Sequence, residues 1–89
     1  MNADRRRIVT NAVRALTEAK LLVDQTRPFV ERVRDEEGQS SDNIPDNLQG
    51  TKRALDVDQN AAVLEDFVNK LEEISDALDE AIAMESDLK

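Results

Sequence analysis

Apolar side chains recur at heptad spacing along two long stretches of this chain, separated by one short stretch rich in Asn, Asp, Gly and Pro. In each long stretch the apolar residues occupy three of the seven heptad positions. Two helices that pack only against each other need two such positions. The pattern therefore predicts an all-α antiparallel helical hairpin of the coiled-coil type that dimerises into a four-helix bundle.

The first helix is predicted from about residue 3 to residue 37, with Asn2 as its N-cap. Pro28 lies inside it and predicts either a kink or a restart of the helix. Because the apolar phase continues through Pro28, we favour a kink. The helical stripe consists of Val9, Ala12, Leu16, Ala19, Val23, Thr26, Val30 and Val33, flanked by Ile8, Ala15, Leu22 and Phe29.

A connector is predicted over residues 38–50, because Gly38 is a typical residue for ending a helix. Pro45 can open a short helical turn that Gly50 closes. The second helix is predicted over about residues 51–88, and its start can lie as late as Asp56. Its seam consists of Val57, Leu64, Leu71 and Leu78, with Phe67, Ile74, Ala81 and Leu88 on one side and Ala61, Val68, Ser75 and Ile82 on the other.

Charge is divided unevenly along the chain, which carries a formal net charge of −8. Residues 1–34 are net basic and residues 35–89 are strongly acidic, so antiparallel arms are charge-complementary. In such a hairpin, residues whose numbers sum to about 90 lie level. This register places Arg5, Arg6 and Arg7 beside the acidic end of the second helix.

The residue types exclude several classes of chemistry. The chain has no Cys and no His, so it has no disulfide, no zinc site built on thiolate or imidazole, and no Ser-His or Cys-His pair. The motif Asp56-x-Asp58-x-Asn60 begins like a calcium loop, but Ala61 and Phe67 replace the required Gly and Glu. We therefore predict no enzyme activity, no cofactor and no metal site.

No apolar run approaches the length that spans a bilayer, so we predict a cytoplasmic chain without a membrane partner. Its acidity argues against direct nucleic-acid binding. The outer face of the second helix can be simply solvated. Alternatively it mimics nucleic acid, with carboxylates in place of phosphates, and inhibits a host nucleic-acid-binding or defence enzyme. The candidate residues of this acidic face are Glu65, Glu72, Glu73 and Asp76.

The hinge residues resemble a pattern in a family of small helical proteins. The matching stretches are Asp35-Glu36-Glu37, Asp42-Asn43-Ile44-Pro45-Asp46-Asn47-Leu48-Gln49-Gly50-Thr51, and Arg53. This uncharacterised family is frequently encoded by bacteriophages and prophages. An aromatic residue of the family's spacer is absent here, where Gln39, Ser40 and Ser41 stand. The resemblance implies an acidic helical hairpin and a phage context, without an activity.

The same hinge is the most function-like segment of the chain. It is either a structural corner or a recognition loop at one end of a rod. The candidate partner-binding residues are Asp42, Asn43, Pro45, Asn47, Leu48 and Gln49. We therefore predict a homodimeric protein-interaction module, phage or mobile-element encoded, that binds an unidentified protein.

Overall fold

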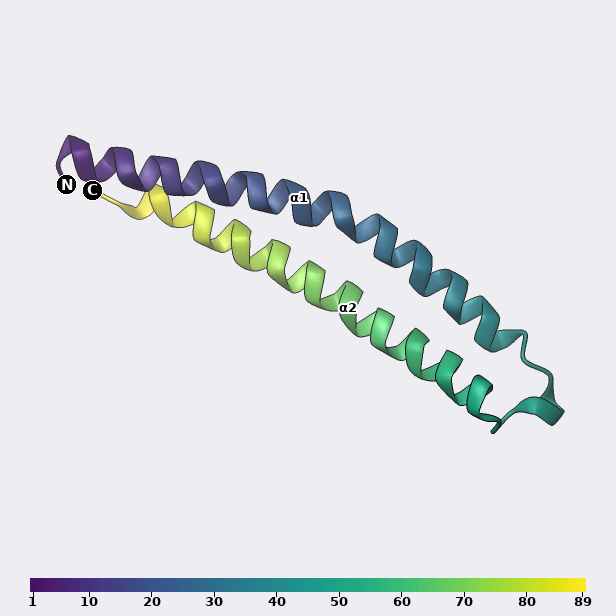
Figure 1. Ribbon diagram of the computed structural model, residues 1–89. Helices are drawn as coiled ribbons and strands as arrows, with labels where there is room; N and C mark the ends of the chain where they lie inside the picture. Colours follow the sequence, from purple (N-terminus) through teal and green to yellow (C-terminus); the bar gives the residue numbers. More distant parts are fainter.

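A computed structural model describes all residues, 1–89, and shows one antiparallel helical hairpin without strands (Figure 1). Helix α1 spans Ala3–Asp42 and helix α2 spans Lys52–Ala83, followed by the 3-10 turn η2, Met84–Asp87. The two chain ends meet, since the Met1 amino group donates to the Lys89 carbonyl at 3.2 Å. The predicted hairpin is confirmed.

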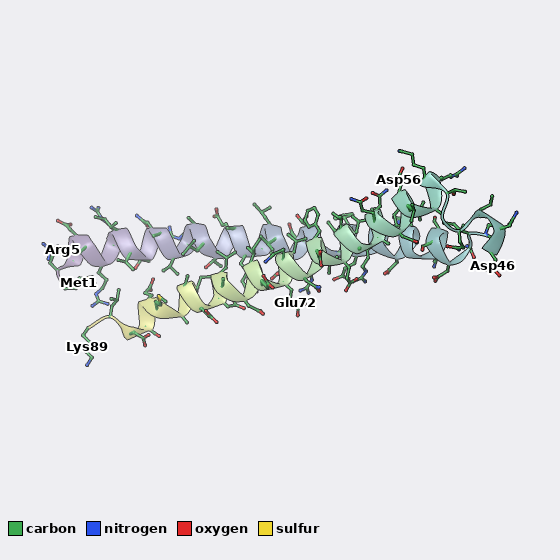
Figure 2. All side chains as sticks on the ribbon, turned by 90° about the horizontal axis from the view of Figure 1, so that it is seen from below. Met1, Arg5, Asp46, Asp56, Glu72 and Lys89 are labelled. Carbon is green, nitrogen blue, oxygen red and sulfur yellow. The ribbon has the colours of Figure 1, made fainter.

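The hairpin is a thin rod of 70 × 16 × 15 Å. Its radius of gyration is 20.2 Å, whereas a compact chain of this length would have about 12 Å. Figure 2 shows Asp46 at one end of this rod and Met1 and Lys89 at the other. A rod only two helices wide has almost no interior, so few of its side chains can be fully buried.

Helix α1 begins where the sequence predicts, because the Asn2 side chain accepts a hydrogen bond from the Arg5 amide at 2.8 Å. The helix continues unbroken through Pro28, and it changes direction near its middle (Figure 1). Continuation of the helix through Pro28 is thus confirmed.

The predicted end of α1 at Gly38 is wrong, because the helix continues for one more turn to Asp42. The space around Gly38 is open, and the Ser40 hydroxyl donates to the Glu36 carbonyl within the same turn. A single glycine costs a helix only about 1 kcal/mol relative to alanine. Ser41 also hydrogen-bonds to Asp58 of α2, which ties this last turn to the hairpin.

The connector is therefore shorter than predicted, but its turn and cap residues have the expected roles. Pro45 precedes the 3-10 turn η1, Asp46–Leu48. Gly50 has a φ of 89°, a left-handed conformation that favours glycine. Thr51 then caps α2, since its hydroxyl accepts from the Ala54 amide at 3.3 Å.

Helix-to-helix contact comes from half-buried residues at alternating spacings of three and four. On α2 the contact positions are the predicted seam and one of its predicted flanks: Val57, Leu64, Leu71 and Leu78 with Ala61, Val68, Ser75 and Ile82. On α1 they are Val9, Val13, Leu16, Lys20, Val23, Arg27, Val30 and Arg34. The predicted α1 stripe is thus partly wrong: Ala12, Thr26 and Val33 are exposed.

The cause of this difference is that three long basic side chains take part in the α1 contact line. Lys20, Arg27 and Arg34 keep their charged groups at the edge, and their aliphatic stems cover part of the seam. Helix α1 thereby turns its predicted apolar stripe partly away from α2. Only three residues of the hairpin are buried: Ala54, Val68 and Ser75.

The register also differs from the prediction. Lys20 contacts Ser75, and Arg34 contacts Glu65, so each α2 residue lies about one and a half to two and a half helical turns further along α1 than expected. The extension of α1 past Gly38 by about one turn contributes to the shift. The predicted contacts of Arg5, Arg6 and Arg7 with α2 are absent, and Arg7 pairs only with Asp4 of its own helix.

Candidate functional site

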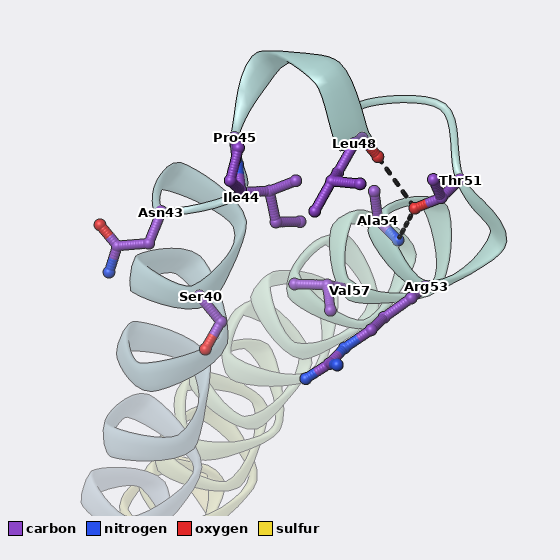
Figure 3. Close-up of a pocket in the computed structure, with 9 residues that line it drawn as sticks. All are labelled: Ser40, Asn43, Ile44, Pro45, Leu48, Thr51, Arg53, Ala54 and Val57. Carbon is purple, nitrogen blue, oxygen red and sulfur yellow. Dashed lines mark hydrogen bonds between the residues drawn. The ribbon is translucent and has the colours of Figure 1, made fainter.

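A hollow of about 430 Å³ lies at the hinge end of the rod (Figure 3). Ile44, Leu48 and Val57 point into the space between the helix ends, whereas the Asn43 amide points away (Figure 3). Leu48 remains 46% exposed. The complete lining is Ser40, Asn43, Ile44, Pro45, Leu48, Thr51, Arg53, Ala54 and Val57.

The structure brings three of the six predicted hinge residues to this hollow, namely Asn43, Pro45 and Leu48. Gln49 is used internally, since its amide donates to the Ile44 carbonyl at 3.0 Å. The other two predicted residues, Asp42 and Asn47, lie outside the lining. The hollow also includes residues absent from the predicted site, of which Arg53 supplies the only charge.

A polar cluster that the sequence interpretation missed joins the two helices at mid-length. The Lys20 ammonium lies 2.9 Å from Asp24, 3.4 Å from Asp79 and 3.2 Å from the Ser75 hydroxyl. The Ser75 hydroxyl in turn donates to Asp24 at 2.7 Å. A polar group at a contact position specifies helix register. The position of Lys20 in the heptad pattern of α1 could therefore have predicted a polar contact between the helices.

These contacts shift the pKa of both members of the Lys20–Asp24 ion pair. Hydrogen bonds from Ser75 and Lys20 lower the pKa of Asp24. The hydrogen bond to Asp24, assisted by Asp79, raises the pKa of Lys20 despite partial desolvation. Both shifts favour the charged forms, so the cluster is ionic at neutral pH.

Acid is expected to remove the stabilising contribution of Asp24. Because its pKa is lower in the folded chain than in the unfolded one, the unfolded chain binds more protons, and the contribution fades below about pH 4. Asp24→Asn should therefore lower the melting temperature at pH 7 and have a much smaller effect near pH 2. Circular-dichroism melts over this range measure the difference. Glu18→Gln, which removes an unpaired carboxylate from α1, is the control, and a pH-independent difference for Asp24→Asn would contradict the assignment.

One edge of the hairpin carries all the ionic and polar contacts between the side chains of the two helices. They are Lys20–Asp79, Arg34–Glu65 at 3.3 Å, Ser41–Asp58 and the Ser75 contacts of the cluster. The acidic partners Asp58, Glu65 and Asp79 each directly follow a contact residue of α2. We call this edge the ion-paired edge.

The opposite side of the rod is apolar. Each residue step rotates a helix by about 100°, so residues that precede contact positions point away from the ion-paired edge, on the same side of both antiparallel helices. We call this surface the apolar face. Its residues are Ile8, Ala12, Ala15, Ala19, Leu22, Thr26, Phe29 and Val33 of α1 and Val63, Phe67, Lys70, Ile74, Ala77, Ala81 and Met84 of α2 and η2, with Leu88 beyond the last turn. Nearer the hinge the same side of α2 is polar, with Arg53, Asp56 and Asn60.

Large side chains on the apolar face are well exposed in the hairpin. The exposed fractions are 63% for Leu22, 70% for Phe29, 57% for Val63 and 47% for Phe67. Lys70 is the one charged residue of the face, and it pairs with Glu73 of its own helix at 3.1 Å. A contiguous exposed apolar surface of this length is typical of an interaction site.

The predicted acidic face is divided by ion pairing. Glu65 pairs with Arg34 and Glu73 pairs with Lys70, whereas Glu72 and Asp76 are exposed without an ion-pair partner. Glu65, Glu72 and Asp76 lie away from the apolar face, whereas Glu73 borders it through its ion pair with Lys70. A partner can therefore cover one surface without covering the other.

Three further findings bear on the class of protein. No group of three or more acidic side chains lies close enough to hold a metal ion. Neither helix is sufficiently apolar over its length to cross a membrane. No family model, curated protein or solved structure matches the chain.

Proposed function

We propose that this chain is a non-enzymatic protein-interaction module that self-associates through its apolar face. The observation that carries the proposal is the continuous apolar surface along α1 and residues 63–88, on the side opposite the ion-paired edge. Covering Leu22, Phe29 and Phe67 would add favourable burial, at about 25 cal/mol per Å² of apolar surface. The resemblance at the hinge supports a phage or mobile-element context in the cytoplasm.

The small number of buried residues supports the same proposal. A hairpin with three buried residues has no core comparable to that of an independently stable domain. A second copy supplies the missing layer, since two hairpins with facing apolar surfaces form a four-helix bundle. The wide apolar stripe of each helix is the pattern that such a bundle requires.

The mass of the native chain in solution tests this proposal. We expect light scattering at micromolar concentration to give about twice the 10.0 kDa chain mass, because a dimer buries both apolar faces. Repeating the measurement over a dilution series separates a stable dimer from nonspecific aggregation, which increases in size with concentration. A monomer of 10.0 kDa with a cooperative melt would contradict self-association.

We also propose that the hinge hollow recognises the protein partner. Exposed Leu48, the apolar lining and the charge of Arg53 together form an amphipathic concavity held by η1. Replacing residues 43–49 by a Gly/Ser linker of equal length is expected to abolish capture of a bacterial protein by the immobilised chain. Helicity and dimer mass serve as controls. Unchanged capture by the variant would mean that the hinge only connects the two helices and does not bind the partner.

The alternative function is inhibition of a nucleic-acid-binding enzyme by an acidic surface that mimics nucleic acid. Exposed Glu72 and Asp76, unpaired on the solvent side of α2, favour it. Ion pairing of Glu65 and Glu73 weakens it, because both carboxylates are partly neutralised within the hairpin. Capture that survives hinge replacement but is lost in Glu72→Gln/Asp76→Asn would place this function first.

A further inference from the structure

We infer that the two copies associate with their rods antiparallel, in one defined register, so that the two hinges lie at opposite ends of the dimer. This inference rests on the proposed self-association and adds its geometry. The occupant of the apolar face is a second copy of this chain, and size and charge complementarity along the face carry the argument.

The apolar face of α1 is complementary to itself about the point between Lys20 and Leu21. A two-fold axis perpendicular to the rod at this point stacks α1 on α1 of the second copy, with opposite directions. Phe29 then lies level with Ala12 of the second copy, and Leu22 lies level with Ala19. In the middle of the face large side chains thus face small ones, the arrangement that lets helices interdigitate at even spacing. At its ends Ile8 lies level with Val33.

The same axis gives a similar match on the central part of α2, whereas toward the ends Phe67 lies level with Met84 and Val63 with Leu88. About the point between Ser75 and Asp76, Ile74 lies level with Ala77 of the second copy, and Lys70 lies level with Ala81. The two symmetry points are level with each other in the hairpin, because Lys20 contacts Ser75 at 3.2 Å. One two-fold axis therefore pairs large with small residues over the central part of both helices.

Charges at the ends of the α1 face agree with this register. Arg5 lies one turn before Ile8, and Glu36 lies one turn after Val33. The same axis brings Arg5, which has no ion-pair partner in the hairpin, level with Glu36 of the second copy. Glu36 pairs only with Arg32 of its own helix, and both side chains are mostly exposed. Such a surface pair contributes little free energy but helps to select orientation.

Parallel rods give a poorer match. A two-fold axis along the rod stacks α1 on α2 of the second copy at the same level. Phe29 then faces Phe67, and Ala19 faces Ala77. Large residues oppose large ones and small oppose small, so straight helices would be too close at one end or too far apart at the other. The antiparallel dimer avoids this and leaves both hinge hollows uncovered, facing opposite directions.

Energy transfer between dyes tests the geometry, and the absence of native cysteine makes each label unique. In one preparation, donor- and acceptor-labelled Asn47→Cys chains are mixed, which places dyes on the two hinges. In a second preparation the labels are on Gln25→Cys, near the two-fold axis. At 1.5 Å per residue the hinge dyes are ~80 Å apart in the antiparallel dimer, and the Gln25→Cys dyes are close.

We expect strong transfer for Gln25→Cys and little transfer for Asn47→Cys. Strong transfer at both positions would overturn the antiparallel geometry while leaving self-association intact. Absence of transfer at both positions, with both labelled chains helical by circular dichroism, would overturn the dimer itself and this inference with it.

Discussion

Leu71→Asp is expected to unfold the protein under conditions in which Glu72→Ala leaves it fully folded. Leu71 is a half-buried contact residue of α2, near the middle of the helix-to-helix seam. An aspartate there would place an unpaired carboxylate between the helices, at a cost of several kcal/mol. Few small proteins have a stability margin much larger than that.

The neighbouring Glu72 provides a matched control. Its side chain is exposed and has no ion-pair partner, so replacement by alanine should change the free energy of unfolding by no more than about 0.5 kcal/mol. Circular-dichroism melts of the two variants measure the contrast. Equal melting temperatures would mean that the seam lies elsewhere on α2.

The existence of both helices and their antiparallel pairing could be predicted from periodicity. The contact positions of α2 were also predictable, because leucines recur at seven-residue steps from Leu64 to Leu78. Caps and turn residues were equally informative: Asn2, Pro45 and Thr51 occupy the expected places. These features depend on residues that are close together in the sequence, so they can be predicted without the tertiary structure.

The contact line of α1 could not be predicted in the same way. Its apolar residues cover a broad arc, so periodicity alone left several rotations of the helix possible. The structure selects the rotation in which Lys20 and Arg34 reach acidic partners across the seam. That choice depends on long side chains with both apolar and charged parts, which a hydrophobic pattern counts as polar.

The candidate sites were predicted unevenly for a related reason. The excess apolar strip was evident from the heptads, and the structure places it on one exposed face. The hinge residues were recognised by composition, which does not distinguish side chains that line the hollow, such as Leu48, from those that hold the loop, such as Gln49. The helix that continues past Gly38 contributed to the register error.

The second large effect concerns two adjacent leucines on α1. Leu22 belongs to the apolar face and is 63% exposed, whereas Leu21 is 57% exposed and lies beside Lys20 and Asp24 on the other side of the rod. Leu22→Glu and Leu21→Glu thus have the same composition, net charge and helix propensity. Only their position around the helix differs.

Glutamate at Leu22 would be buried twice in each dimer, at a cost of about 2 kcal/mol or more per copy. Each 1.4 kcal/mol weakens association tenfold, so the dissociation constant should rise on the order of a thousandfold. Glutamate at Leu21 would point to solvent in both monomer and dimer, and association should be nearly unchanged.

Sedimentation equilibrium of these two variants beside the native chain therefore tests most directly whether the apolar face is the surface that joins two copies. We predict that the native chain and Leu21→Glu sediment as dimers and Leu22→Glu as a monomer. Dimers for both variants, or monomers for both, would contradict the account.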